Sequence, residues 1–252
     1  MKYSLISLLL AQSTAAHYVF SHLLVNGTET KEWEYTREIG YGWEGKPYRD
    51  SPAFSVDTQD IICGYTAWNT DNSLSGIKPN TADVVAGSEI GFRISKTYGI
   101  LLPPTNETFL YHEGPAQAYL SRSDNLQAYR GDGDWFKIAA LLAKDDTTWQ
   151  VGGLTVKDAN FTIPRATPPG TYLLRFEQFR PGYDVNQTQW FVACAHINVI
   201  GSGSSTAPTH FAKFPGTYKP EDEGITISPD FYPQGKKSLL QYKPPGPPVF
   251  GA

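Results

Sequence analysis

The stretch QWFVACAHINVI, from Gln189 to Ile200, is dense in β-branched and aromatic residues and predicts a long β-strand. Comparable runs, divided by Gly, Pro, Asn and Asp, occur at His17 to Val25, Ser88 to Ser95, Ala116 to Ser121, Trp135 to Ile138 and Thr171 to Gln178. Helical periodicity is confined to one short candidate, Ile138 to Lys144. Many short strands without interleaved helices favour an all-β fold, a sandwich of two antiparallel sheets.

The chain begins with the pattern of a secretory signal peptide, which we assign to residues 1–16. Lys2 provides a basic start, Leu5 to Leu10 an apolar run, and small residues lead up to Ala16. Cleavage after Ala16 would make His17 the first residue of the secreted chain. A cut a residue or two away would instead leave His17 as an ordinary residue near the terminus.

A histidine at a free N-terminus carries an α-amino nitrogen and an imidazole on one residue, and the two can close a chelate ring on one metal ion. The α-amino group has an ordinary pKa of about 7.7 to 8.0, so a metal that binds nitrogen strongly can displace its proton. Among divalent first-row metals Cu(II) binds such nitrogen sites most strongly and prefers a tetragonal plane. The sequence therefore indicates a copper site at His17.

The mature chain, residues 17–252, is long enough for one large β-domain or two small ones. A formal net charge of −4 gives no reason to expect nucleic acid or an anionic membrane as a partner, and no mature segment is apolar enough to span a bilayer. After Ile200 the run GSGSSTAP is typical of a linker, and the segment from about 207 to 252 is too thin to form its own core. We expect a single monomeric domain with this last segment wrapped along the sandwich.

The chain contains two cysteines, Cys63 and Cys194, and secretion into an oxidising compartment favours a disulfide between them. The bond would close a loop of about 130 residues, worth about 4 to 5 kcal/mol in the chain-entropy model. Two unpaired buried thiols are the alternative. N-glycosylation sequons, which also fit secretion by a eukaryotic cell, start at Asn26, Asn106, Asn160 and Asn186.

A long insertion, about Thr28 to Phe54, separates the first two predicted strands. A loop of this length in a compact domain is usually functional or disordered, and its aromatic density argues against disorder. Its aromatic residues are Trp33, Tyr35, Tyr41, Trp43 and Tyr48.

A set of motifs, taken in this order, points to a family. They are His17, HEGP from His112 followed by AQAYLS, WFKI from Trp135, PPGTYLLRFE from Pro168, QTQWFVACAHI from Gln187, FPGTYKPEDEGI from Phe214 and the closing PPGPPVFGA. The combination resembles the fungal lytic polysaccharide monooxygenases of auxiliary activity family nine, formerly classed as glycoside hydrolases. The resemblance covers essentially the whole mature chain.

This resemblance implies an immunoglobulin-like or fibronectin III-like sandwich that holds one copper ion on a flat face. The amino group and imidazole of His17, with the imidazole of His112, would form a histidine brace. The protein would then use an external electron donor and O₂ or H₂O₂ to abstract hydrogen at C1 or C4 of a β-1,4-glucan such as cellulose. From the residues alone, His112 is a loop histidine beside the turn signal Gly114-Pro115.

The strand from Gln189 bears on the site, because residues at i and i+2 of a strand point to the same side. Gln189 and Phe191 therefore share one face, while Trp190 and Cys194 share the other. The family pattern has a glutamine and a tyrosine facing the copper from this strand. Gln189 matches the glutamine and would be a catalytic hydrogen-bonding residue, whereas Phe191 occupies the axial position without supplying an oxygen ligand.

The family pattern also carries a second histidine a few residues after an Arg-His-Glu motif, which is Arg-Phe-Glu here, from Arg175 to Glu177. The segment that follows, Gln178 to Gly182, contains no histidine, and Arg180 is the nearest candidate to replace it. An arginine donates hydrogen bonds but does not pass on a proton, so general acid assistance, typically worth about 10² to 10⁴ in rate, would be lost.

For the polysaccharide we select Tyr41, Trp43 and Tyr218 as candidate binding residues, because aromatic faces pack against sugar rings. Two alternatives to the monooxygenase remain open. One is a copper-binding or carrier protein of the same fold, suggested by Phe191 and the missing histidine. The other is a glycoside hydrolase, which needs a pair of carboxylates such as Glu113 and Glu177.

Overall fold

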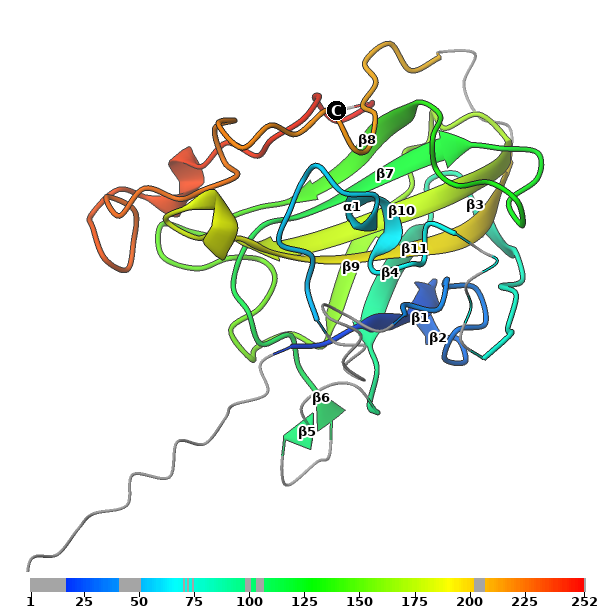
Figure 1. The fold of residues 1–252 in the computed structure, drawn as a ribbon, viewed down its shortest axis with the longest axis horizontal. Helices are drawn as coiled ribbons and strands as arrows, with labels where there is room; N and C mark the ends of the chain where they lie inside the picture. The colour runs from blue at the N-terminus through cyan, green and yellow to red at the C-terminus, as the bar shows by residue number, and fades with distance from the viewer. Residues whose placement is uncertain are drawn as a thin grey trace, which may run out of the picture.

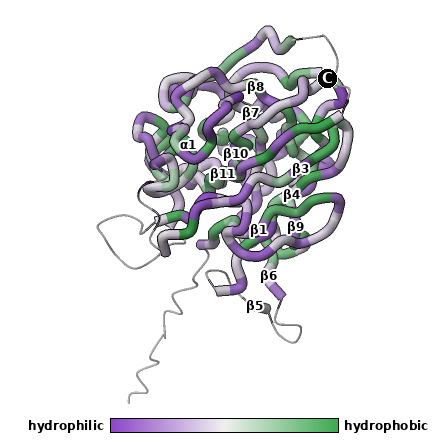
Figure 2. The backbone as a smooth tube through the Cα atoms, turned by 90° about the vertical axis from the view of Figure 1, so that its right-hand side faces the viewer, coloured by the Kyte–Doolittle hydropathy of each residue, from purple (hydrophilic) through white to green (hydrophobic). Residues whose placement is uncertain are grey.

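A computed structural model describes residues 17–40, 51–69, 71, 73, 75–97, 101–102, 107–201 and 207–251. Two sheets pack face to face in a β-sandwich, as predicted (Figure 1). In the described ranges no helix has the length and apolar character needed to cross a bilayer. Hydrophobic segments of the chain lie along strands of both sheets, for example near β3, Ala82–Val85, and β4, Glu89–Ile94 (Figure 2).

The smaller sheet has the order β2, β1, β4, β9, formed by Thr28–Glu29, Phe20–Val25, Glu89–Ile94 and Asp158–Thr162. The larger sheet has the order β3, β11, β10, β7, β8, formed by Ala82–Val85, Gln189–Ile200, Gly170–Arg180, Ala116–Arg122 and Trp135–Leu141. β5, Leu101–Leu102, and β6, Glu107–Thr108, form a separate hairpin. All pairs are antiparallel except β3, which runs parallel to β11.

Helical segments in the described ranges are short: α1 is Asp60–Cys63, and the 3₁₀ turns η3 and η4 are Val185–Gln187 and Leu239–Gln241. The predicted helix Ile138 to Lys144 is wrong. Its first half belongs to β8, which pairs with β7 through contacts such as Ala116 to Leu141. Pairing with a distant strand outweighs the weak helical propensity of a short Ala- and Leu-rich run.

The sandwich core is built around Phe176, which points from β10 toward the smaller sheet. Its ring lies 5.0 Å from Phe20 of β1, 4.9 Å from Phe92 of β4 and 5.9 Å from Phe161 of β9. These phenylalanines therefore join strands of both sheets through edge-to-face and stacked contacts. Packing at this point fixes the distance between the layers and so holds the ends of the strands in place.

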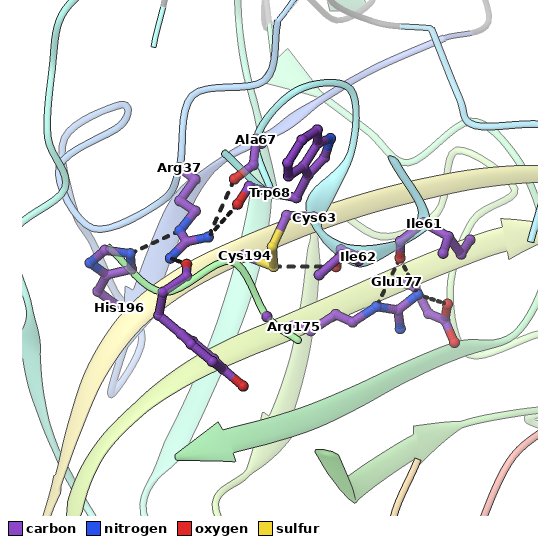
Figure 3. The surroundings of a disulfide bond; sticks show 12 residues. Arg37, Ile61, Ile62, Cys63, Ala67, Trp68, Arg175, Glu177, Cys194 and His196 are labelled. Atoms are coloured by element: carbon purple, nitrogen blue, oxygen red, sulfur yellow. Dashed lines mark hydrogen bonds and ion pairs between the residues drawn. A yellow bond between two sulfur atoms is a disulfide. The ribbon is translucent and has the colours of Figure 1, made fainter. Parts of the chain in front are cut away.

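The opposite face of β10 and β11 is covered by α1 (Figure 3). Cys63 at the end of α1 forms the predicted disulfide with Cys194 of β11. Arg175 of β10 donates from Nε and Nη2 to the carbonyl oxygen of Ile61, at 3.1 and 2.8 Å. Its Nη2 also lies 2.6 Å from Glu177 Oε2, and both side chains are fully buried. The hydrogen bonds from Arg175 to Ile61 and the disulfide together hold α1 on the sheet.

Residues 207–251 lie along β8 and the loop after β10 (Figure 1). Ala212 forms a bridge with Trp135, and the backbone N–H of Phe250 donates to the carbonyl oxygen of Lys137 at 2.7 Å. At the other end, Thr226 forms a bridge with Gly182. A small second core forms from this segment and a neighbouring loop, with Ala143, Phe231, Leu239 and Tyr242 buried.

A buried arginine, Arg37, connects the insertion to β11 (Figure 3). Its Nε donates to His196 Nε2 at 2.9 Å, and its Nη2 donates to the carbonyl oxygens of Leu126 and Tyr129 at 2.9 and 2.7 Å. Burial, followed by the charge of Arg37, lowers the pKa of His196 to about 3. His196 is therefore neutral in the folded protein over the whole physiological range.

This histidine should make stability depend on pH. Below the ordinary histidine pKa of about 6.5 the unfolded chain binds a proton that the folded chain excludes, so stability falls as the pH falls toward 3. The expected loss at pH 5 is about 2 kcal/mol, at 1.36 kcal/mol per pH unit. Denaturant titrations at pH 7 and pH 5 measure it. His196→Gln, which still accepts from Arg37, should remove that loss; an unchanged pH dependence would contradict the assignment.

Candidate metal centre

The register of the two central strands gathers polar and aromatic side chains at one end of the larger sheet. Gln178 of β10 lies opposite Phe191 of β11, and Arg180 lies opposite Gln189. Residues directly opposite each other in an antiparallel pair share a face. The face is the one that carries Phe176, so all of these side chains point toward the smaller sheet. The predicted shared face of Gln189 and Phe191 follows from this register.

His17 and His112, nearly a hundred residues apart in the chain, lie next to each other at this edge. Their ring centroids are 6.2 Å apart, with an angle of 43° between the planes. The Phe191 ring lies 5.3 Å from the His112 ring and 6.1 Å from the His17 ring. The two histidines selected from the sequence therefore lie next to each other, and both are close to the ring of Phe191.

The backbone of His112 is held by the loop that contains Gly152. The N–H of Gly114 donates to the carbonyl oxygen of Val151, and Gly152 has a φ of +104°. A Cβ atom on Gly152 would lie 2.0 Å from the carbonyl oxygen of His112, so no larger residue fits there without moving the histidine. The close approach fixes the direction of the His112 side chain.

Sequence reasoning missed two residues that support the site, Tyr18 and Gln178. The Tyr18 hydroxyl donates to Gln178 Oε1, and Gln178 Nε2 donates to the carbonyl oxygen of His112 at 3.1 Å. The Tyr18 ring stacks on Phe191 at 4.4 Å. The available signal was Gln178 itself, because a polar residue inside the apolar run of a central strand requires a buried partner.

The environment keeps the imidazole of His112 neutral. Burial, then the positive charge of Arg180, then His17 lower the pKa of His112 to about 4. A neutral imidazole has a lone pair to offer, which is the form that binds a metal. Burial also raises the pKa of the Tyr18 hydroxyl, so this group stays a hydrogen-bond donor.

The residues present fit a copper ion. His112 Nε2 and Gln189 Oε1 are buried atoms without a hydrogen-bond partner in the described part of the chain. Because metal–imidazole bonds are about 2 Å long, rings centred 6.2 Å apart leave room for one ion. No cluster of at least three His, Cys, Asp or Glu side chains occurs among the described residues. If cleavage after Ala16 exposes the amine of His17, that amine would add a third nitrogen to the two imidazoles.

A cavity of about 850 Å³ opens beside His112. Glu113, Arg180 and Gln189 line it next to the histidine. The far wall of the cavity comes from the loop after β10 and from the C-terminal segment, which lie side by side in Figure 1.

The aromatic residues chosen for polysaccharide binding need correction. Tyr218 is only 1% exposed, and its hydroxyl donates to the buried Glu177, so it offers no face to a sugar. Tyr41 and Trp43 lie outside the described residues. The cavity is instead lined by Phe54, Tyr183 and Tyr232, which are 39%, 53% and 43% exposed.

The carboxylate pair needed for glycoside hydrolysis is not available. Glu177 is fully buried on the opposite face of β10, where Arg175 and Tyr218 bind it. Glu113 lines the large cavity and is exposed. The two therefore face different sides of the larger sheet, and hydrolysis by this pair is excluded.

The remaining sequence expectations concern modification and processing. Asn26, Asn160 and Asn186 are exposed, as glycan acceptors must be. Asn106 and residues 1–16 lie outside the described residues. The exposed side chains stay predicted glycosylation sites.

Comparisons with known proteins agree with this geometry. The profile of Auxiliary Activity family 9, formerly GH61, matches residues 17–238 and so begins at His17. The chain is 44% identical over 254 residues to AA9 family lytic polysaccharide monooxygenase U of Thermothielavioides terrestris, covering 92% of this chain and 91% of that one. It is 34% identical over 248 residues to monooxygenase C of Emericella nidulans, covering 96% and 94%.

Solved structures share the fold. The crystal structure of HiLPMO9B superposes with a TM-score of 0.69 at 22% identity, covering 94% of this chain and all of that one. The extended catalytic domain of H. jecorina LPMO9A gives a TM-score of 0.67 at 24% identity, with 94% and 92% covered. At these identities the likeness supports the immunoglobulin-like sandwich, while the family match comes from the sequence.

Proposed function

Because the chain belongs to Auxiliary Activity family 9, we propose that it holds one copper ion through His17 and His112 and cleaves a β-1,4-glucan. Family members are copper-dependent enzymes that cleave polysaccharides oxidatively, and this protein is one of them. The observation that carries the residue assignment is the pair of rings 6.2 Å apart, with a buried, unpartnered Nε2 on His112.

The proposal includes processing and secretion. Cleavage after Ala16 would expose the amine of His17, and the start of the family match at His17 supports this boundary. The mature chain would then be one secreted domain, residues 17–252, acting as a monomer. N-terminal sequencing of the secreted protein tests the boundary directly, because any other first residue removes the amine nitrogen from the site.

Copper held by His17 and His112 would supply one-electron chemistry with O₂ or H₂O₂ and an external electron donor, for the removal of hydrogen at C1 or C4 of the sugar. Three side chains of the site would support this chemistry. His112 presents a neutral nitrogen because burial and Arg180 exclude its proton. The Gln189 amide can hydrogen-bond to an oxygen species beside His112. Phe191, stacked between Tyr18 and His112, fills the side of the site where a tyrosine oxygen would otherwise reach.

Arg180 lines the same cavity as His112 and Gln189, and its charge acts on the histidine. Its guanidinium can donate hydrogen bonds to an oxygen or to a sugar hydroxyl. It cannot deliver a proton, since it stays protonated in proteins. Proton delivery would therefore come from water in the open cavity, which suits a slower reaction than one with a positioned acid.

The glucan chain would lie in the large cavity. Tyr183 and Tyr232 come from different segments and expose their rings on the same hollow as His112. A cavity of about 850 Å³ is in the range of ligand sites in general. Sugar rings present C–H groups that pack on such aromatic faces.

Replacing both Tyr183 and Tyr232 with alanine should weaken binding to cellulose or a soluble β-glucan by about tenfold, at about 0.5–1.5 kcal/mol per aromatic contact. Copper content should stay unchanged. Pull-down isotherms and metal analysis measure the two quantities. The control is Phe211→Ala, since Phe211 is 50% exposed but does not line the cavity. Equal losses in both variants would exclude the cavity as the binding surface.

The decisive assay is product analysis by mass spectrometry after incubation of the copper-loaded mature protein with β-glucan and ascorbate. Oxidised oligosaccharides that disappear without reductant or with a copper chelator are expected. A protein that binds one equivalent of copper and releases no oxidised product would be a carrier. Unoxidised oligosaccharides that persist with the chelator would indicate hydrolysis.

A further inference from the structure

The sequon at Asn186 lies in a tightly fixed turn between β10 and β11. Asn186 is exposed, and its Nδ2 donates to Asp184 Oδ1 at 3.0 Å. Thr188, the third residue of the sequon, is buried. Its Oγ1 accepts from the N–H of Gly182 at 3.0 Å and donates to the carbonyl oxygen of Ile225 at 2.9 Å. The turn therefore presents the Asn186 amide in one direction.

A second cavity, of about 550 Å³, opens directly beside Asn186. Phe54 and Tyr65 supply aromatic surface to it, and Thr58 and Asp60 supply polar groups. Phe54 is 39% exposed, so part of its ring is uncovered. An aromatic wall with a few hydrogen-bonding groups is the composition that binds a sugar ring. Asn186 belongs to the lining of this cavity, so a group attached to its amide starts at the cavity itself.

We propose that Asn186 carries an N-linked glycan whose first N-acetylglucosamine lies in this cavity against Phe54 and Tyr65. The bond forms between Nδ2 and C1 of the sugar. One Nδ2 proton leaves, and the lipid pyrophosphate of the oligosaccharide donor departs. The nitrogen keeps its other proton and so can still donate to Asp184 Oδ1. The glycan must be added before folding, because the Thr188 hydroxyl is engaged in the folded protein.

The asparagines of the other two described sequons, Asn26 and Asn160, line neither of these two cavities. Asn26 lies in the turn between β1 and β2, and nothing lies within 4 Å of the Cβ position of its neighbour Gly27. Asn160 projects from β9, the last strand of the smaller sheet. A glycan at Asn26 would extend into open space, which makes this sequon a matched control.

The glycan would also affect the substrate-binding surface. Phe54 lines both cavities, so a sugar packed on one side of its ring limits its movement on the side of the large cavity. The proposal rests on passage through a eukaryotic secretory pathway but not on copper chemistry. A thermal unfolding measurement of the metal-free protein tests it separately from the proposed enzyme activity.

The first experiment compares the Asn186→Gln and Thr28→Val variants of the mature protein secreted by a fungal host. Thr28→Val removes the Asn26 sequon at an exposed residue and leaves Asn26 in place, whose φ of +49° suits asparagine better than glutamine. Glycopeptide mass spectrometry should find Asn186 occupied. Asn186→Gln should lower the Tm by about 2–4 °C, the shift expected for one modest interaction in a chain of this size, and Thr28→Val should leave it unchanged. Trimming wild-type glycans to a single N-acetylglucosamine should keep most of the stability. An unoccupied Asn186, or equal Tm values for the two variants, would overturn the proposal.

A double-mutant cycle with Phe54→Ala separates sugar packing from any effect of the substitution on the turn. Phe54→Ala should lower the Tm more in the glycosylated protein than in the Asn186→Gln background. The same comparison between wild-type chains from fungal and bacterial hosts needs no change at Asn186. An identical effect of Phe54→Ala with and without the glycan would show that the sugar does not lie on this ring and would refute the proposal.

Discussion

Replacing His112 with alanine is expected to abolish copper retention and, with it, the release of oxidised oligosaccharides. The substitution removes a neutral imidazole whose buried Nε2 has no hydrogen-bond partner in the described part of the chain. The expected loss of copper affinity exceeds the 10–100-fold that loss of an outer-shell partner typically costs, because a direct ligand is removed. Isothermal titration with Cu(II) and electron paramagnetic resonance of the loaded protein measure it.

The matched control is His210→Ala. His210 is exposed and contacts the neighbouring Thr209, far along the chain from the site. This variant should bind one equivalent of copper and form product at the wild-type rate. Circular dichroism should show both variants folded, since the fold around His112 is also held by backbone bonds such as Gly114 to Val151. If His112→Ala still bound one copper ion with unchanged affinity, the two-histidine site would be wrong.

The second large effect is expected from the double substitution Cys63→Ser and Cys194→Ser. The disulfide spans a sequence separation of 131 residues. For a loop of that length the chain-entropy model gives about 5 kcal/mol, which is a large share of the stability of an ordinary domain. At about 2–4 °C per kcal/mol, the Tm should fall by about 10–20 °C. The substitution also releases α1 from β11, so Arg175 would lose its fixed acceptor at Ile61.

Chemical denaturation of the oxidised wild type, the reduced wild type and the double variant tests this expectation. The reduced protein and the variant should unfold at similar denaturant concentrations, well below that of the oxidised protein. Copper binding by the folded variant should be retained, since the site lies on the other face of β11. A loss below about 1 kcal/mol would mean that α1 is held by its other contacts and that the unfolded chain is already restricted.

The central strands could be predicted from the sequence, because each is a run of β-branched and aromatic residues bounded by Gly, Pro, Asn or Asp. The range Gln189 to Ile200 is reproduced residue for residue by β11. Alternation along it also separated Phe191 from Cys194 correctly. The strands Ala82–Val85 and Asp158–Thr162 were missed because they are short and half exposed, and their pairing comes from distant partners.

The site was only partly predictable for a similar reason. His17 and His112 could be selected because their motifs have a recognisable order in the chain. Gln178 offered a signal, as a polar residue inside an apolar strand, but its partner Tyr18 did not, since their contact depends on the register that sets Gln178 opposite Phe191. The aromatic residues of the cavity, Phe54, Tyr183 and Tyr232, were harder still to predict. They come from separate loops, and no local sequence pattern shows that these loops lie close together. Tyr218 was chosen for its residue type, yet the C-terminal segment turns its ring inward.

β10 keeps two incompatible sets of side chains apart. Arg175 and Glu177 point to one side, and Phe176 and Gln178 point to the other. If the strand paired one position out of step, the two charges would enter the layer of phenylalanine rings and lose their partners, at several kcal/mol per ion. The misaligned arrangement would also carry the glutamine away from His112. The buried charges of Arg175 and Glu177 are therefore paired only in the register that also places Gln178 beside His112.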